Sequence, residues 1–133
     1  MEKSQQELLF QFSMLEQQIQ NLQQQLRAIE EAIVDVNTLN LGLDDLKDSV
    51  GKEIMAPLGR GIFVKTRLIS DKMVVDVGGR NFVTKSVSET KNIVESQSKK
   101  LEEIKEEILA HLEGADKELS KIVSQASENK EAE

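Results

Sequence analysis

The sequence predicts an α+β fold: a long antiparallel coiled coil of two helices, with two β-hairpins between the helices. Two flanking segments repeat apolar residues at coiled-coil spacing, over intervals of 42 residues from Leu8 to Val50 and 39 from Val87 to Ala126. At about 1.5 Å per residue, each interval corresponds to about 60 Å of helix. The segment between them is rich in β-branched residues and glycine, which is typical of hairpins. The matched lengths favour two helices that pack against each other within one chain.

The composition is typical of one small domain without a large apolar interior. The chain has 133 residues, of which 38% are hydrophobic, 31% charged and 3% aromatic, and aromatic side chains normally supply much of a core. Cysteine is absent and there is one histidine, so disulfides, thiolate nucleophiles and Cys- or His-based metal sites are not expected. The sequence has no signal-peptide pattern and no apolar run near the ~20 residues that span a bilayer. We therefore expect a soluble, cytoplasmic protein that binds no metal, cofactor or membrane.

The first flank, residues 1–53, predicts one long helix. Ser4 and Glu7 fit a capping box, which places the helix start near residue 5. Nine apolar residues then alternate at spacings of four and three, the heptad pattern of a coiled coil: Leu8, Phe12, Leu15, Ile19, Leu22, Leu26, Ile29, Ile33 and Val36. Asn40 takes the next seam position, where a polar residue typically sets the register. Leu43 follows Asn40 in the seam, and Leu46 and Val50 continue it after a three-residue break.

The central segment, residues 54–85, predicts two β-hairpins. The first joins residues 54–58 to residues 62–69 through Gly59-Arg60-Gly61. The second joins residues 73–77 to residues 81–85, with Gly78-Gly79 as a two-residue turn that supplies positive φ angles. Pro57 has no N–H to donate and is therefore expected at an edge or at a strand end.

The second flank, residues 86–126, predicts the returning helix. Ser86 and Glu89 form a second capping box. The expected seam has one stutter, between Ile108 and Leu112, and comprises Val87, Thr90, Val94, Gln97, Leu101, Ile104, Ile108, Leu112, Ala115, Leu119, Ile122 and Ala126. Residues 127–133 are polar and are expected to fray.

The hairpins are expected to require partners. Four short strands cannot close a sheet, and open strand edges favour pairing with other chains. Strands from several subunits are therefore expected to join in a barrel-like platform, although a monomer with protected edges is the alternative. The expected oligomerisation residues are Ile62, Phe63, Val64, Leu68, Met73, Val75, Val77, Phe82 and Val83.

The start of the first helix has more apolar residues than its seam needs. Leu9, Phe10 and Met14 lie outside the heptad positions. An exposed apolar patch of this kind usually marks an interaction site, and Met and Phe adapt to varied apolar surfaces. A wide core stripe or a fraying terminus is the alternative explanation.

No enzyme is expected from this sequence. Four carboxylates, Glu102, Glu103, Glu106 and Glu107, are most simply a solvated helix face, because a catalytic carboxylate needs an environment that shifts its pKa. His111 lies beside the expected stutter and is interpreted as a packing residue. Residues 54–87 have a net charge of +4, but they lie between segments of −6 and −5, and the whole chain is −7. Nucleic acid is therefore not an expected partner.

The central segment also resembles a known family. Two stretches, Ile54-Met55-Ala56-Pro57-Leu58-Gly59-Arg60-Gly61-Ile62-Phe63-Val64 and Val74-Val75-Asp76-Val77-Gly78-Gly79, between two long helices are similar to the alpha-class subunit of archaeal prefoldin. The resemblance implies a hexamer of two alpha and four beta subunits, whose hairpins form a double β-barrel platform. It further implies an ATP-independent chaperone that binds unfolded or nascent polypeptides and delivers them to a group II chaperonin.

In that family the distal coiled coil contacts the client. The resemblance transfers this role to nine residues of the present chain: Leu8, Leu9, Phe10, Phe12, Met14, Leu15, Leu119, Ile122 and Val123. The alternative function is a structural coiled-coil tether or spacer that binds no client.

Overall fold

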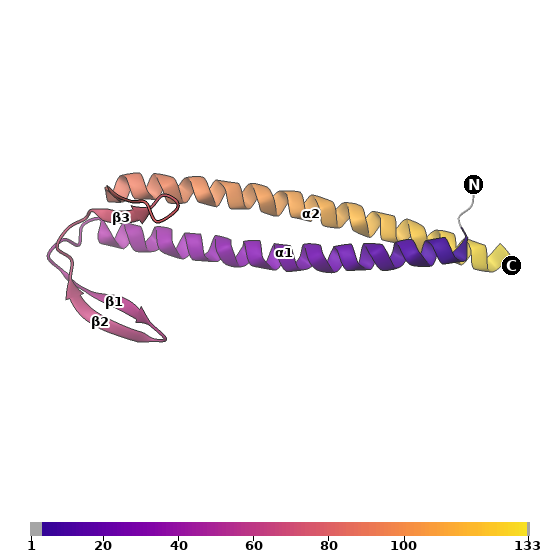
Figure 1. Cartoon of the computed structure of the whole chain (residues 1–133), viewed down its shortest axis with the longest axis horizontal. Coiled ribbons are helices and arrows are strands. Elements are labelled where there is room, and N and C mark those ends of the chain that lie inside the picture. Colours follow the sequence, from indigo (N-terminus) through magenta and orange to yellow (C-terminus); the bar gives the residue numbers. More distant parts are fainter. Residues whose placement is uncertain (1–3, 133) are drawn as a thin grey trace. The chain divides into compact units, whose positions relative to one another are not determined.

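The computed structural model describes residues 4–132 and has two long helices with two hairpins between them (Figure 1). This confirms the predicted fold class. The elements in chain order are α1 (Gln5–Leu46), β1 (Glu53–Gly59), β2 (Ile62–Arg67), β3 (Met73–Asp76), β4 (Phe82–Lys85) and α2 (Val87–Ala132).

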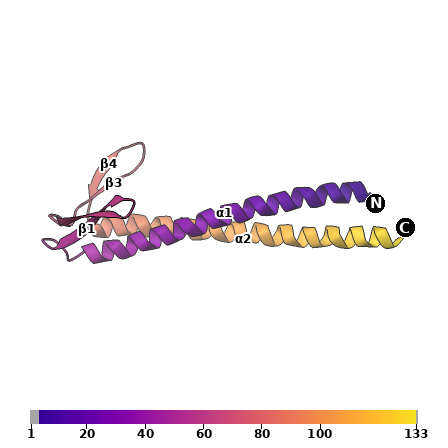
Figure 2. The same ribbon diagram turned by 90° about the horizontal axis from the view of Figure 1, so that it is seen from below.

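The chain forms two compact units. The terminal unit combines the chain up to Ile33 with the chain from Lys100 onward, and the hairpin unit comprises Val34–Lys99. In the terminal unit, the beginning of α1 lies beside the end of α2 (Figure 2). Leu8 and Leu15 pack there against Ala115 and Ile122. The earliest residues of α1 thus meet late residues of α2, as antiparallel packing requires.

The hairpin unit has its own small core. Leu43 of α1 packs against Val87 and Val94 of α2, and Met73 of β3 packs against this cluster. An ion pair between Asp44 of α1 and Lys91 of α2 lies at the surface nearby. The pKa of Lys91 is raised, chiefly because its ammonium donates a hydrogen bond to Asp44.

Both helix starts agree with the predicted capping boxes. The Glu7 backbone N–H donates to Ser4 Oγ at 3.2 Å. At the start of α2 the bonds are reciprocal: the Glu89 N–H donates to Ser86 Oγ at 3.1 Å, and the Ser86 N–H donates to Glu89 Oε1 at 3.2 Å. These bonds satisfy backbone N–H groups that have no acceptor within the helix.

The capping box of α2 predicts a pH dependence of stability. The pKa of Glu89 is lowered, first by the hydrogen bond from the Ser86 N–H, then by the Ser86 hydroxyl, and to a smaller extent by the charge of Lys85. A lowered folded-state pKa stabilises the fold above the unfolded-state pKa, and that stability is lost as the pH falls through the folded-state pKa. Circular dichroism is expected to show a lower melting temperature for Glu89→Gln than for the natural chain at pH 7, and a difference that shrinks as the pH falls below the ordinary pKa of a glutamate. A difference that does not change with pH would contradict this prediction.

α1 ends earlier than the sequence pattern indicates. The helix stops at Leu46 rather than near residue 53, and Val50, predicted to lie on the seam, is exposed outside it. The Lys47 N–H bonds to the Asp44 carbonyl and the Ser49 N–H to the Leu46 carbonyl, so the chain tightens into i→i+3 turns. Gly51 then adopts a φ of 87°, which a helix cannot include.

The seam of α2 also differs from the prediction. Gln97 and Ile104 are exposed, whereas their neighbours Ser98 and Lys105 are half-buried. Positions 90, 94 and 98 are buried or half-buried and are spaced by four residues twice in succession. The stutter therefore lies around Val94, whereas it was expected between residues 108 and 112. The long aliphatic stem of a lysine can line a helix interface while its ammonium stays in water.

The end of α2 extends further than predicted. The helix continues to Ala132, so residues 127–132, expected to fray, are helical, and Glu133 lies outside the described residues. Glu, Lys and Ala are strong helix formers, which explains why the helix continues beyond the apolar seam.

The two hairpins are separate two-stranded antiparallel sheets, as predicted. Ala56 pairs with Val64 in the first and Val75 with Val83 in the second, and Pro57 lies within β1 where the register shifts. The second turn is centred one residue later than expected. The Asn81 N–H bonds to the Gly78 carbonyl, and the two central residues, Gly79 and Arg80, have φ angles of 59° and 64°, as in a type I′ turn.

Asn40 lies on the α1 seam as predicted, and it is half-buried. Its Oδ1 atom is buried and has no hydrogen-bond partner among the described residues. It borders a hollow of about 300 Å³ near the stutter, whose lining includes Val36, Val94 and Ser98. A buried acceptor without a partner costs about 1–3 kcal/mol.

Asn40→Leu is therefore expected to stabilise the chain. Leucine removes the unpaired acceptor and fills the seam, so the melting temperature should rise by about 3–6 °C. Thermal unfolding followed by circular dichroism measures the shift. A fall in melting temperature would show instead that Asn40 makes a favourable contact that leucine cannot replace.

Candidate functional site

The nine residues predicted to contact clients occupy two kinds of position in the terminal unit. Leu8, Leu15 and Ile122 are buried between the helices, and Phe12 and Leu119 are half-buried beside them. The remaining four are exposed side chains: Leu9, Phe10, Met14 and Val123. The exposed fractions of Phe10 and Met14 are 66% and 55%, so the core does not close over them.

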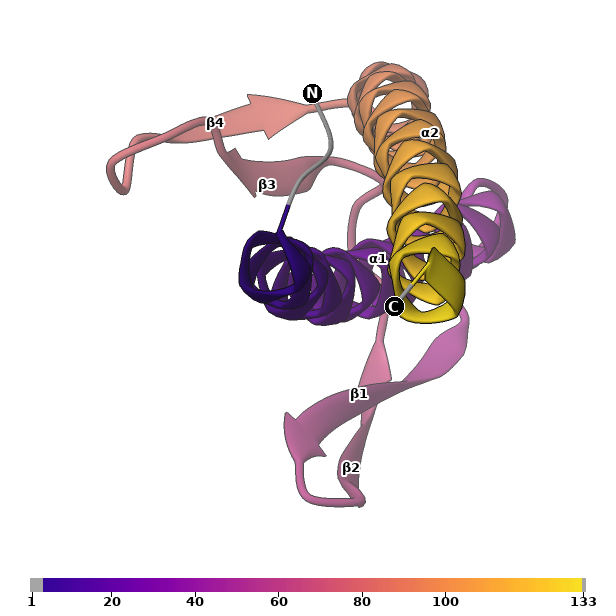
Figure 3. The same ribbon diagram turned by 90° about the vertical axis from the view of Figure 1, so that its right-hand side faces the viewer.

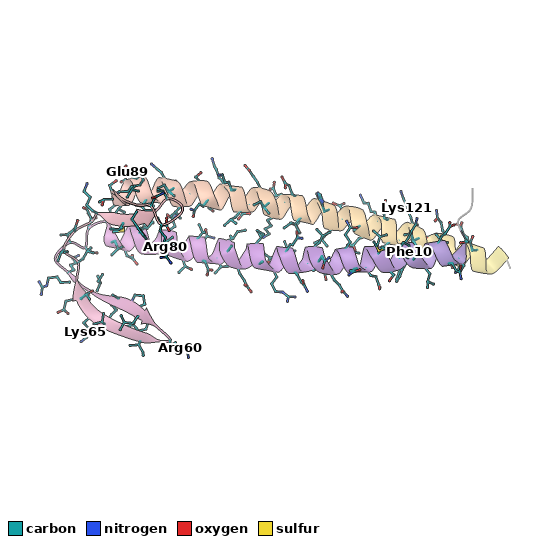
Figure 4. All side chains as sticks on the ribbon, viewed as in Figure 1. Phe10, Arg60, Lys65, Arg80, Glu89 and Lys121 are labelled. Atoms are coloured by element: carbon teal, nitrogen blue, oxygen red, sulfur yellow. The ribbon has the colours of Figure 1, made fainter. Side chains whose placement is uncertain are left out.

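A groove lies between α1 and α2 in this unit. Its volume is about 350 Å³, and Phe10 and Lys121 lie on its two walls (Figure 4). α1 contributes Phe10, Gln11, Met14 and Leu15, and α2 contributes Glu118, Lys121, Ile122 and Gln125. The lining thus combines an apolar wall with charged side chains, and an apolar side chain from another polypeptide can bury surface there.

The predicted oligomerisation residues lie on both hairpins. Six are exposed: Ile62, Phe63, Val64, Val77, Phe82 and Val83. Leu68, Met73 and Val75 are half-buried, and Met73 already contributes to the core of the hairpin unit.

The cross-strand register shows which face of the first hairpin is apolar. Ile54 pairs with Thr66 and Ala56 with Val64, and alternation along β2 places Ile62 on that same face. The opposite face pairs Glu53 with Arg67, Met55 with Lys65 and Pro57 with Phe63. Each face retains exposed apolar side chains in the single chain, so the hairpin has apolar surface available to pack against other subunits.

The hairpin ends are basic and conformationally unusual. The two hairpins project in different directions within the hairpin unit (Figure 3), and Arg60 and Arg80 lie at their turns (Figure 4). They are the two non-glycine residues with positive φ among residues 4–132, at 52° and 64°. Glycines with positive φ lie on both sides of Arg60, and Gly79 with positive φ precedes Arg80, which lets the chain reverse over so few residues.

Sequence reasoning missed one apolar residue of the terminal unit, Leu109. Its exposed fraction is 45%, and it borders a shallow hollow on α2. Leu109 directly follows the seam residue Ile108 and lies off the seam, so the signal that marks Leu9 next to Leu8 could have identified it. His111, interpreted as a packing residue beside the expected stutter, is exposed.

Metal ligands, membrane-spanning helices and the carboxylates of α2 can also be compared with the structure. No three His, Cys, Asp or Glu side chains gather into a metal-binding group within residues 4–132. None of the helices in this described part is long and apolar enough to cross a membrane. The four helix carboxylates from Glu102 to Glu107 are exposed, as the sequence indicated.

The sequence is similar to known proteins over most of its length. A family model described as prefoldin subunit matches residues 15–132. The prefoldin alpha subunit of Methanobrevibacter smithii is 29% identical over 123 residues, covering 92% of this chain and 84% of that protein. That of Methanococcus vannielii is 33% identical over 107 residues, covering 80% and 72%. That of Methanosphaera stadtmanae is 26% identical over 90 residues, covering 68% and 65%.

The fold is also similar to a solved structure. A cryo-EM structure of filamentous PFD from Methanocaldococcus jannaschii superimposes with a TM-score of 0.74 at 20% sequence identity. The match covers 86% of this chain and 96% of that chain. At this identity the similarity demonstrates the shared fold.

Proposed function

Since this chain belongs to the prefoldin subunit family, we propose that it holds non-native polypeptides at the apolar surface of its terminal unit and delivers them to a group II chaperonin. The members of this family are non-enzymatic chaperone subunits that assemble into oligomers. The observation that supports this proposal most strongly is the exposed apolar wall of Phe10 and Met14 beside the groove. Such a surface binds exposed apolar segments of an unfolded chain and needs no nucleotide.

Magnitudes favour weak and reversible holding. Burying about 200 Å² of apolar surface on one subunit stabilises by about 5 kcal/mol before the cost of ordering the client. A single contact is therefore short-lived. Several subunits that bind one client raise the effective concentration, so weak contacts add up to useful avidity while each remains releasable.

The oligomer is proposed to contain two alpha and four beta subunits, joined through the hairpins in a β-barrel platform. The exposed apolar side chains on both hairpins support a platform of this kind, because these strands have open edges and uncovered faces in the single chain. The similar fold in a filamentous assembly makes self-assembly of this chain the competing outcome.

A dilution assay tests the proposed function. A chemically unfolded client is diluted into buffer with or without the assembled complex, and aggregation is followed by light scattering without ATP. We expect the complex to suppress aggregation, and subsequent addition of a group II chaperonin with ATP to recover native client. Unchanged aggregation would contradict client holding and favour the structural tether. Suppression without recovery would contradict delivery alone.

A further inference from the structure

On the basis of the proposed function, we propose that the client site extends from the groove toward the middle of the coiled coil, over the exposed backbone of α2 at Gly114. The ligand is an extended segment of a non-native polypeptide. One apolar side chain of this segment enters the groove beside Phe10, and its main chain passes over Gly114 next to the amide of Gln18. The heptad repeat, an exposed helix glycine and an uncharged face of α1 support this inference.

Gln18 and Gly114 continue the two walls of the groove. Residues seven positions apart occupy equivalent places along a coiled coil. On α1, Gln18 lies seven positions after the wall residue Gln11. On α2, Gly114 lies seven positions before the wall residue Lys121. Because the two helices run antiparallel within the terminal unit (Figure 2), both steps lead from the groove in the same direction and keep to the same side of the helix pair.

Gly114 leaves this part of the α2 surface without a side chain. It lies in the interior of the helix and is exposed. A Cβ atom added there would meet no atom within 4 Å apart from its chain neighbours and the adjacent helix backbone, so the packing of the helices does not require a glycine. Its φ angle is not positive, so the backbone conformation does not require one either. A glycine at such a position weakens the helix relative to alanine and allows the main chain of a ligand to approach closely.

The neighbouring face of α1 is uncharged and rich in amides. Gln18 and Asn21 are exposed, and neither side chain bonds to another described residue. Positions beside a coiled-coil seam often carry charged residues that pair between the helices, but residues 17–26 contain no charged side chain. An amide both donates and accepts hydrogen bonds. It can therefore bind the N–H and C=O groups of an extended main chain whatever the sequence of the client.

These features define the ligand as an extended segment. A helical or folded segment already uses its N–H and C=O groups in its own structure, so it does not offer them to the amides. One heptad of helix is about 10 Å long, and an extended chain covers that distance with about three residues. The site therefore favours a non-native segment with one large apolar residue next to about three residues of free main chain.

Gly114→Ala is expected to stabilise α2 and to weaken client binding. The methyl group has room and improves helix propensity, so the melting temperature should rise by about 2–4 °C. The same methyl group keeps the main chain of the client away, and the loss of about one hydrogen bond raises the Kd about fivefold. Fluorescence anisotropy measures the Kd, with the assembled complex titrated into labelled, reduced and carboxymethylated α-lactalbumin as an unfolded client. An unchanged or lower Kd for Gly114→Ala would overturn the proposal.

Matched variants separate this site from client holding in general. Gly42→Ala adds the same methyl group at an exposed helix glycine of the hairpin unit, and it should raise the melting temperature without changing the Kd. Gln18→Ala should raise the Kd about fivefold. Gln23→Ala, which removes an exposed amide on the other flank of the α1 seam, should leave the Kd unchanged.

The outcomes also distinguish this inference from the proposed function. If Gly42→Ala or Gln23→Ala raises the Kd as much as its matched partner, the extended site is wrong, while aggregation suppression by the complex still supports the proposed function. If the natural complex neither binds the labelled client nor suppresses aggregation, both proposals fail.

Discussion

Ile62→Asp combined with Val64→Asp is expected to release this chain from its oligomer as free subunits. Both residues lie on the apolar face of the first hairpin, and both are exposed in the single chain, so the isolated subunit has room for the carboxylates. In a barrel formed by several hairpins the same face is buried, and an unpaired buried charge costs several kcal/mol. Two such charges should raise the dissociation constant of the oligomer by at least about a thousandfold.

Native mass spectrometry measures this effect directly. Val34→Asp combined with Leu41→Asp is the matched control, because it introduces the same two charges at exposed residues of α1 outside the hairpins. The double hairpin variant should appear as free subunits and the control as the intact oligomer. An intact oligomer of the hairpin variant would show that the subunits join through another surface.

The triple substitution Leu9→Ser, Phe10→Ser and Met14→Ser is expected to abolish most client holding while the oligomer stays intact. All three side chains are more than half exposed, so their removal leaves no cavity in the core. Each large apolar side chain contributes up to about 1.5–3 kcal/mol when a client covers it. Together they should weaken client binding by at least tenfold.

Aggregation suppression and native mass are measured on the same preparation. Leu39→Ser combined with Leu41→Ser removes exposed leucines from the hairpin unit and should leave suppression unchanged. If the triple variant loses its oligomeric mass, these side chains serve assembly rather than client binding. If the triple variant still suppresses aggregation fully, another surface holds the client.

The heptad pattern predicted α1 well and α2 only in part. In α1 every seam position up to Val36 is apolar, so one register fits, and all of them are buried or half-buried. In α2 two adjacent registers compete. One register contains Gln97 and Ile104, and the other contains Ser98 and Lys105. Gln97 and Ser98 are both polar, so hydrophobicity favours the register with Ile104. The structure has the other register, in which Lys105 lies at the interface and can pack through its aliphatic stem. Packing against the partner helix decides such a case, and that information is not local to the sequence.

Turn chemistry predicted the hairpins but not every boundary. Five glycines with positive φ lie at Gly51, Gly59, Gly61, Gly78 and Gly79, and the pattern located both reversals of the chain. The two central residues of the second turn were expected to be Gly78 and Gly79. They are Gly79 and Arg80 instead, because Arg80 also adopts a positive φ angle. The end of α1 was placed late because Val50 suits the seam, whereas Gly51 already requires a non-helical conformation.

The candidate site was predictable where its residues break the periodicity. Leu9, Phe10 and Met14 were identified because an apolar residue off the seam is unusual, and the structure places them on the surface. Leu109 also lies off the seam. It directly follows the seam residue Ile108, as Leu9 follows Leu8, so the same signal is present in the sequence.

Site-specific photocrosslinking tests most directly the central claim that clients bind at the terminal unit. A photoreactive amino acid is placed at Phe10 or, in a separate preparation, at Leu41, two positions with nearly equal exposed fractions of 66% and 67%. Each assembled complex is irradiated with an unfolding client. We predict strong client adducts from position 10 and few from position 41. Equal adducts from both positions, or adducts from position 41 alone, would contradict the claim.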